Sequence, residues 1–187
     1  MTEWSRRYSG WESDFRGAGD RLSARSETLL ELVGRSVAAG WTVWDHRRER
    51  SLLIGPLVLV LSDGSQVEIA WDGWNDLSLT RDTVDLTTPA QVLGGAWTWR
   101  PSEPQPVAVI AGRTITGFAA VETPYFDGGE DLSELPLERA KGWLADGLWI
   151  EFGDIGLHVY NSADDNGYSS SPYLKVHEGA TRVTRLG

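Results

Sequence analysis

The sequence contains no cysteine. Disulfides, thiolate metal sites and thiol nucleophiles are therefore excluded, and the absence is typical of proteins from a reducing compartment. Histidine is scarce as well, and the three histidines show none of the close spacings that zinc sites use: they are His46, His158 and His177. The residue patterns thus predict neither a metal ion nor a cofactor.

Long apolar segments are also missing. The longest run, Leu52–Leu61, has about ten residues, which is about half of the length that a membrane-spanning helix needs. Residues 1–17 contain no apolar stretch of the kind found in secretory signals. We therefore expect a cytoplasmic protein that does not associate with membranes.

The motifs that bind nucleotides or activate a serine do not occur. There is no G-x-x-x-x-G-K-[ST] loop, no G-x-G-x-x-G loop and no G-x-S-x-G elbow. The stretch SADDNG at Ser162–Gly167 has the spacing of the start of a calcium loop, but Ser162 and Tyr173 stand where acidic ligands are needed. A turn is the structure expected there.

Acidic residues are abundant and unevenly placed. The formal net charge is -10, and residues 122–178 hold twelve acids against one arginine and two lysines. Phosphate contacts need lysine and arginine, so this charge predicts no binding to nucleic acid. An acidic surface attracts a basic protein partner and speeds the encounter with it, although acidity also serves solubility alone.

One short string occurs twice. GRSV at residues 34–37 matches GRTI at residues 112–115, and a Gly-aromatic pair follows each copy. An apolar strand, a turn with Asp and Gly, an alternating strand and an acidic loop with Asn then follow in the same order. The strand pairs are residues 57–71 and 148–161, and the loops are residues 71–79 and 161–169. β-branched and aromatic residues with glycine punctuation favour strands over helices.

These repeats predict an α+β fold that is mainly β. We expect two diverged β-rich repeats, packed as one domain of antiparallel sheet with one or two short helices. The expected order is a polar arm or short helix at residues 1–28, the first repeat at 29–100 and the second repeat at 107–187. A proline-rich linker, Arg100–Val107, joins the repeats, and the second repeat carries an insertion at about residues 124–145.

Two segments near the repeats are interpreted individually. Within the insertion, a short helix is expected around Leu137–Leu144. Near the first string, SETLLELVG has the pattern of a helix with Ser26 as N-cap. The repeat argues instead that Leu30–Val37 is partly extended, and both interpretations stay open.

The ten tryptophans supply candidate binding anchors. Most of them are expected in the core, but an exposed tryptophan beside acids is typical of a protein contact. The best candidates lie in and beside the two acidic loops. They are Trp71, Asp72, Trp74, Asp76, Asp164, Asp165, Asn166 and Tyr168.

The segment Gly147–Tyr168, GLWIEFGDIGLHVYNSADDNGY, resembles a recurrent bacterial pattern. In that pattern a hairpin of the form L-x-F-x-D-G-x-L-x-I precedes N-x-x-D-E/D-N-G, with L-x-G-R-x-V/I upstream. Proteins with it are small and acidic, and some are similar to immunity proteins of polymorphic toxin systems. Residues Gly153–Gly156 depart from the plain Asp-Gly turn of the pattern. The resemblance implies a kind of protein and carries no catalytic residue.

The leading hypothesis is a non-catalytic protein-binding module, of the immunity type, that occludes a basic site on a toxin partner. One alternative is a carboxylate-dependent hydrolase acting on a carbohydrate or ester, since glycosidases use a pair of carboxylates. Another is a structural or housekeeping domain whose acidity serves solubility. The sequence leaves the oligomeric state open.

Overall fold

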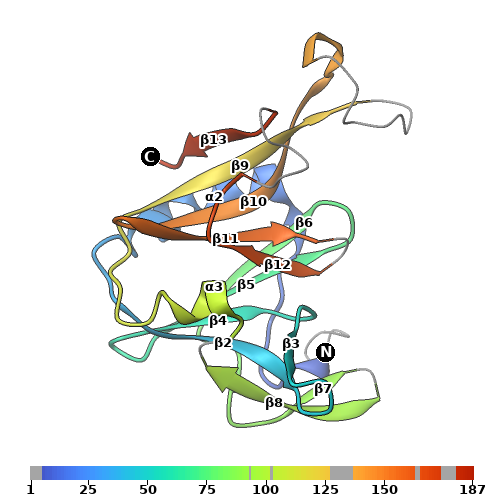
Figure 1. Ribbon diagram of the computed structural model, residues 1–187, viewed down its shortest axis with the longest axis vertical. Helices are drawn as coiled ribbons and strands as arrows, with labels where there is room; N and C mark the ends of the chain where they lie inside the picture. Colours follow the sequence, from blue (N-terminus) through green and yellow to red (C-terminus); the bar gives the residue numbers. More distant parts are fainter. Residues whose placement is uncertain (1–5, 93, 102, 127–136, 163–164, 174–179) are drawn as a thin grey trace.

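The computed structural model describes residues 6–92, 94–101, 103–126, 137–162, 165–173 and 180–187. Figure 1 shows two antiparallel sheets, with the helices α2 (Ala18–Leu30) and α3 (Gln105–Ala108) beside them. The predicted class, α+β and mainly β, is confirmed. In the described part of the chain, no helix is long and apolar enough to cross a membrane.

The first sheet has eight strands in the order β1-β6-β5-β4-β2-β8-β7, with β3 paired to β2. Its strands are β1 (Arg16–Gly17), β2 (Val37–Asp45), β3 (Arg50–Leu52), β4 (Leu57–Leu61), β5 (Gln66–Asp72), β6 (Asp76–Arg81), β7 (Ala90–Val92) and β8 (Gly95–Pro101). The second sheet has five strands in the order β12-β11-β10-β9-β13. They are β9 (Gly117–Tyr125), β10 (Gly142–Phe152), β11 (Ile155–Asn161), β12 (Asn166–Ser169) and β13 (Arg182–Arg185).

The two sheets share a pattern of connection. In each, a long strand (β2 or β9) is followed by three strands that step toward one edge, and a later strand (β8 or β13) pairs with its other side. The two Gly-Arg strings hydrogen-bond to each other: Gly34 N–H donates to the Ile115 carbonyl, and Gly112 N–H donates to the Val37 carbonyl, both at 2.8 Å. Corresponding residues therefore exchange equivalent bonds. The origin of this likeness in a duplication stays a prediction.

The main core lies between the inner faces of the two sheets. Val67, Ile69 and Trp71 point into it from β5, as their alternation predicts, and Leu157 and Val159 do so from β11. The two helices close this core at different edges. α2 contacts β6, β9 and β10, whereas α3 contacts β2 and β12.

A second apolar cluster covers the outer face of the first sheet. Tyr8 and Trp11, from the N-terminal segment, are fully buried there against residues such as Val58 and Trp99. The Trp11 indole N–H donates to Thr80 Oγ1 on β6 at 3.0 Å. Residues 6–15 are therefore part of the folded body, and the expected polar arm is a packed strap.

Both helix predictions, the one with Ser26 as N-cap and the one around Leu137–Leu144, need correction. α2 begins at Ala18 with Gly17 as its N-cap, and Ser26 lies inside the helix, where its hydroxyl donates to the Ser23 carbonyl. The helix expected at Leu137–Leu144 is wrong: only a 3-10 turn forms, at Leu137–Arg139. From Gly142 onward the chain is strand, because it pairs with the end of β9.

The expected linker Arg100–Val107 is shorter than predicted. β8 continues through Pro101, which pairs with Trp41 of β2 beyond the reach of β7. A proline is tolerated at such a place because no second strand needs its N–H. Next comes α3, with Pro106 in its first turn, where the missing N–H also costs nothing.

Candidate functional site

The two acidic loops lie side by side at one end of the sheets. One connects β5 to β6 (residues 72–76), and the other connects β11 to β12 (residues 161–166). The Asn161 side-chain amide donates to the carbonyl oxygens of Gly73 at 3.0 Å and Trp74 at 2.9 Å. We call the described residues of these loops, 72–76, 161–162 and 165–166, the two-loop surface. Its two halves come from different sheets.

Trp74 is the most exposed large apolar residue of this surface. Its side chain is 72% exposed, and its ring centroid lies 5.7 Å from that of Tyr125, at the end of β9. Asp72 and Asp76 face each other across the start of the hairpin, and Asp76 is exposed. An indole thus stands in solvent between two carboxylate-bearing residues. This arrangement suits a contact with a partner that offers an apolar pocket edged by cations.

Two of the predicted contact residues lie in the interior. Trp71 is 3% exposed, and its indole N–H donates to the Val159 carbonyl at 3.2 Å. Asn166 is 1% exposed; its amide oxygen accepts from the Trp71 main-chain N–H, and its amide nitrogen donates to the carbonyls of Ile69 and Gly55. Both side chains join the two sheets behind the loops. Neither is available to a partner.

The remaining candidates divide between surface and interior. Asp165 is half-buried, and its carbonyl accepts from Ser162 N–H at 2.7 Å, which closes the second loop. Tyr168 packs against the main core, and burial raises the pKa of its hydroxyl above the ordinary value. Asp164 lies outside the described residues. The accessible part of the prediction is therefore Trp74 and Asp76, with Asp72 and Asp165 partly accessible.

Sequence reasoning missed two residues that shape this surface. Tyr125 lies in the second sheet and Trp74 in a loop of the first, and no local pattern connects the two. Asn161 was identifiable as the first residue of the N-x-x-D pattern. Its role in holding the neighbouring hairpin follows only from the pairing of the two sheets.

A second feature is a cavity of about 420 Å³ between α2, the end of β6 and the N-terminal strap. We call it the α2–β6 cavity. Leu29, Leu32, Val67 and Leu79 form an apolar floor, all of them buried. Charged and hydroxyl side chains surround the mouth. No pattern in the sequence predicted this cavity, because its walls come from three distant segments.

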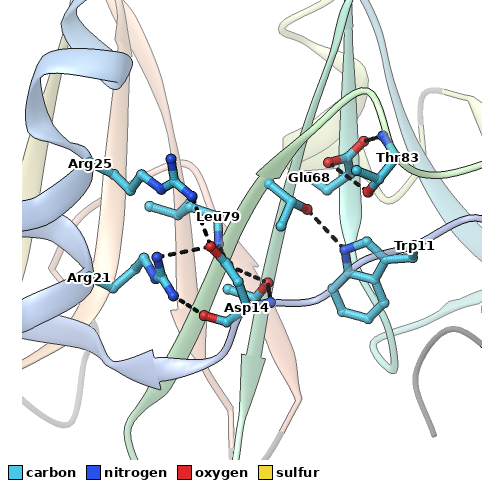
Figure 2. Close-up of polar contacts among 9 residues, drawn as sticks. Trp11, Asp14, Arg21, Arg25, Glu68, Leu79 and Thr83 are labelled. Atoms are coloured by element: carbon cyan, nitrogen blue, oxygen red, sulfur yellow. Dashed lines mark hydrogen bonds and ion pairs between the residues drawn. The ribbon is translucent and has the colours of Figure 1, made fainter. Parts of the chain in front are cut away.

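Asp14 links the three segments that form the wall of this cavity, the strap, β6 and α2 (Figure 2). One carboxylate oxygen accepts from Ser78 Oγ and from the Leu79 main-chain N–H, both at 3.1 Å. The other oxygen contacts Arg21 Nη1 at 2.9 Å and Arg25 Nη2 at 3.0 Å, and Arg21 also donates to the Asp14 carbonyl. The N-terminal strap, β6 and α2 are therefore joined through one carboxylate. Its four donors give this carboxylate a structural role in joining the three segments.

Glu68 is a second buried acid near the strap. It is fully buried on the outer face of the first sheet and accepts from the main-chain N–H groups of Thr83 at 2.9 Å and Val84 at 3.3 Å. These bonds fix the segment that follows β6. Among the described residues, no group of three or more His, Asp or Glu side chains could hold a metal ion. In comparisons with protein-family models, curated proteins and solved structures, nothing matched this chain.

Proposed function

We propose that this chain is a non-catalytic protein-binding module and that the two-loop surface contacts a basic partner. The observation that carries the proposal is Trp74, which is 72% exposed beside Asp72 and Asp76. A tryptophan buries a large area at a contact and is enriched among residues that dominate binding energy. A partner that covers the exposed part of the ring would remove apolar surface from water, which favours binding.

The first of the two loops, residues 72–76, is held in place by contacts with the second sheet. Asn161 fixes the carbonyls of Gly73 and Trp74, and the Tyr125 ring supports the indole from one side. A contact residue that is already held in place loses little conformational freedom when the partner arrives. The acids contribute mainly to the association rate, because the net charge of -10 attracts a basic surface over a distance.

The partner proposed is a toxin domain with a basic site, which the module occludes. The acidity of the chain and the resemblance of Gly147–Tyr168 to immunity proteins support this choice. The module would act in the cytoplasm. No substrate chemistry is needed, since covering the site is sufficient to block the toxin.

The test is a binding measurement with the purified product of the adjacent gene. The intact chain is titrated into that protein at low and high salt, with both rates recorded. We expect Trp74→Ala to weaken binding by about 2 kcal/mol or more, mainly through faster dissociation. Asp72→Asn with Asp76→Asn should slow association and flatten its salt dependence.

Two control variants match these changes. Asp154→Asn removes an exposed acid from the turn before β11, at the opposite end of that strand from Asn161. Val109→Ala shortens an apolar side chain that is 43% exposed beside α3. Both should bind as the unaltered chain does. Absence of binding at low salt, or equal weakening by the controls and by Trp74→Ala, would remove the support for this surface.

The described carboxylates do not support the hydrolase alternative. Glu12 and Asp14 are the acids at the α2–β6 cavity, and both oxygens of Asp14 accept hydrogen bonds from the chain itself. Asp72 and Asp76 are neighbours on an exposed hairpin instead of facing each other across a cleft. Binding is therefore the function that the geometry supports best.

A further inference from the structure

The α2–β6 cavity exists because the N-terminal strap leaves the edge of the first sheet. β1 pairs with β6 only at Leu77 and Asp76. Further along β6 the strap turns toward the outer face, and the Asp14 side chain replaces a strand by accepting from Leu79 N–H. A space remains between the end of β6 and α2. It is separate from the two-loop surface, which begins at the other end of β6.

The floor of this cavity favours an apolar group. Leu29 and Leu32 come from α2 and the turn after it, and Val67 and Leu79 come from the sheet. The volume of about 420 Å³ equals that of roughly fourteen water molecules. A ligand with about a dozen non-hydrogen atoms therefore fits, which is the size of an aromatic acid or a dipeptide.

Two arginines at the mouth favour a negative charge. The Nη1 atom of Arg81 lies 3.8 Å from a Glu31 carboxylate oxygen, which is beyond hydrogen-bonding distance. Within the described residues, the Arg81 guanidinium makes no hydrogen bond. Arg25 donates only to Asp14. Both guanidinium groups thus keep donors that match the two oxygens of a carboxylate.

The acids of the cavity do not offset this preference. Asp14 accepts from Arg21 and Arg25 as well as from β6, so its charge is already matched by the chain. Glu12 is exposed at the mouth and contributes its main-chain N–H to Thr83. Glu31 is a further exposed carboxylate beside the mouth, where it forms a 3.8 Å ion pair with Arg81. An anionic ligand would therefore compete with Glu31 for Arg81 and would share Arg25 with Asp14, beside an apolar floor.

We propose that the α2–β6 cavity binds a small monocarboxylate with an apolar body. The apolar body lies on Leu29, Leu32, Val67 and Leu79, and the carboxylate accepts from Arg81 with Arg25 nearby. The hydroxyl group of Thr28 is a further donor at the same mouth. This chemistry has two sources: a free organic acid, or the carboxyl terminus of a peptide that ends on an apolar residue.

The first test uses isothermal titration of the intact chain with 4-phenylbutyrate and, as the neutral counterpart, 4-phenylbutyramide. The carboxylate should bind and the amide should bind at least about tenfold more weakly, because the amide loses the charge-assisted bonds. Equal affinity of the two compounds, or no binding of the carboxylate at millimolar concentration, overturns the proposal.

Variants then locate the site. Arg81→Gln should weaken 4-phenylbutyrate binding by about tenfold or more. The matched control is Arg113→Gln, which removes a comparably exposed arginine that is paired with Asp154 and does not line the cavity, so it should leave binding unchanged. Thr28→Phe places a ring in the mouth and should abolish binding without changing any charge. Circular dichroism and thermal unfolding verify that each variant is folded.

Glu12→Gln tests the sign of the charge on the ligand. It should leave the binding of the carboxylate unchanged or strengthen it. A Glu12→Gln variant that binds the carboxylate more weakly than Arg81→Gln does would overturn the charge assignment. Trp74→Ala should have no effect, so failure at this cavity and failure at the two-loop surface are separate results.

A last arm distinguishes the two sources. Acetyl-Ala-Leu with a free carboxyl terminus is compared with 4-phenylbutyrate and with its own carboxamide. Tighter binding of the free peptide than of phenylbutyrate identifies a chain terminus as the ligand, and the reverse order identifies a free acid. Equal binding of the peptide acid and its carboxamide counts against a carboxylate site.

Discussion

The main-chain N–H of Trp71 donates to the amide oxygen of Asn166 at 2.9 Å, across the boundary between the two sheets. The same amide group donates to the Ile69 carbonyl at 2.9 Å and to the Gly55 carbonyl at 3.0 Å. One side chain thus completes the hydrogen bonding of two main-chain groups on β5 and one in the loop before β4. We infer that it fixes how the two sheets meet below the acidic loops.

Replacing Asn166 by alanine should therefore lower the free energy of unfolding by about 3 kcal/mol, because buried N–H and C=O groups lose their partners. Urea unfolding followed by tryptophan fluorescence measures the change. Ser170→Ala, at an exposed position nearby, should shift stability by less than about 0.5 kcal/mol. Equal stability of the two variants would show that the amide does not join the sheets.

A second prediction concerns Asp14. Removing its carboxylate in Asp14→Ala leaves Arg21, which is 4% exposed, without its counterion and should cost about 3 kcal/mol of stability. The double variant with Arg21→Met should recover part of this loss, since no uncompensated charge then remains buried. Asp20→Ala, on an exposed face of α2, is the control in the same denaturation experiment. A double variant less stable than Asp14→Ala would contradict the pairing.

The inner faces of the sheets were predictable because they follow local rules. The alternation of Val67, Ile69 and Trp71 identifies a strand and its buried side, and Asp63-Gly64 identifies the turn before it. The outer face of the first sheet was not predictable in this way. Its cover is the strap of residues 6–15, whose sequence is mostly polar and has no periodic pattern.

The candidate site was likewise predictable from the sequence only in part. The two loops are visible in the sequence as acidic segments after each hairpin, and the Asn161 bonds place them together. Sequence alone does not reveal which loop residues point inward, so Asn166 was expected at the surface. Trp71 was expected there too, although its alternation with Val67 and Ile69 already places it on the buried face of β5. Both are buried because the second sheet covers that face of the first. The α2–β6 cavity needs segments too distant in sequence for any local pattern.

A third prediction follows from His158, which is fully buried on β11. Burial lowers the pKa of its imidazole from 6.5 to about 4, and the backbone of Ser171 opposes this shift in part. Between these values the unfolded chain binds a proton that the folded chain does not. Stability should therefore be full above pH 6.5 and fall on acidification.

The expected loss is about 1.4 kcal/mol by pH 5.5 and about 3 kcal/mol near pH 4. Urea unfolding at a series of pH values measures it. His158→Phe should remove this slope between pH 7.5 and 5.5, whereas His46→Gln, at an exposed position, should keep it. An unchanged slope in His158→Phe would assign the proton uptake to other groups.

The last prediction uses two glycines that differ only in their surroundings. A Cβ atom at Gly156 on β11 would overlap the indole ring of Trp149 on the neighbouring strand, whereas a Cβ at Gly142 on β10 meets nothing within 4 Å. Both positions have backbone angles that other residues adopt. Gly156→Ala should therefore destabilise the fold by about 1–3 kcal/mol through overpacking, and Gly142→Ala should be neutral or slightly stabilising. Near-ultraviolet circular dichroism should report a displaced tryptophan in Gly156→Ala alone.

In a Trp149→Ala background the ring is gone, so Gly156→Ala should then lower the free energy of unfolding by almost nothing. A loss of stability that persists there would place the strain in the backbone and not in the ring contact.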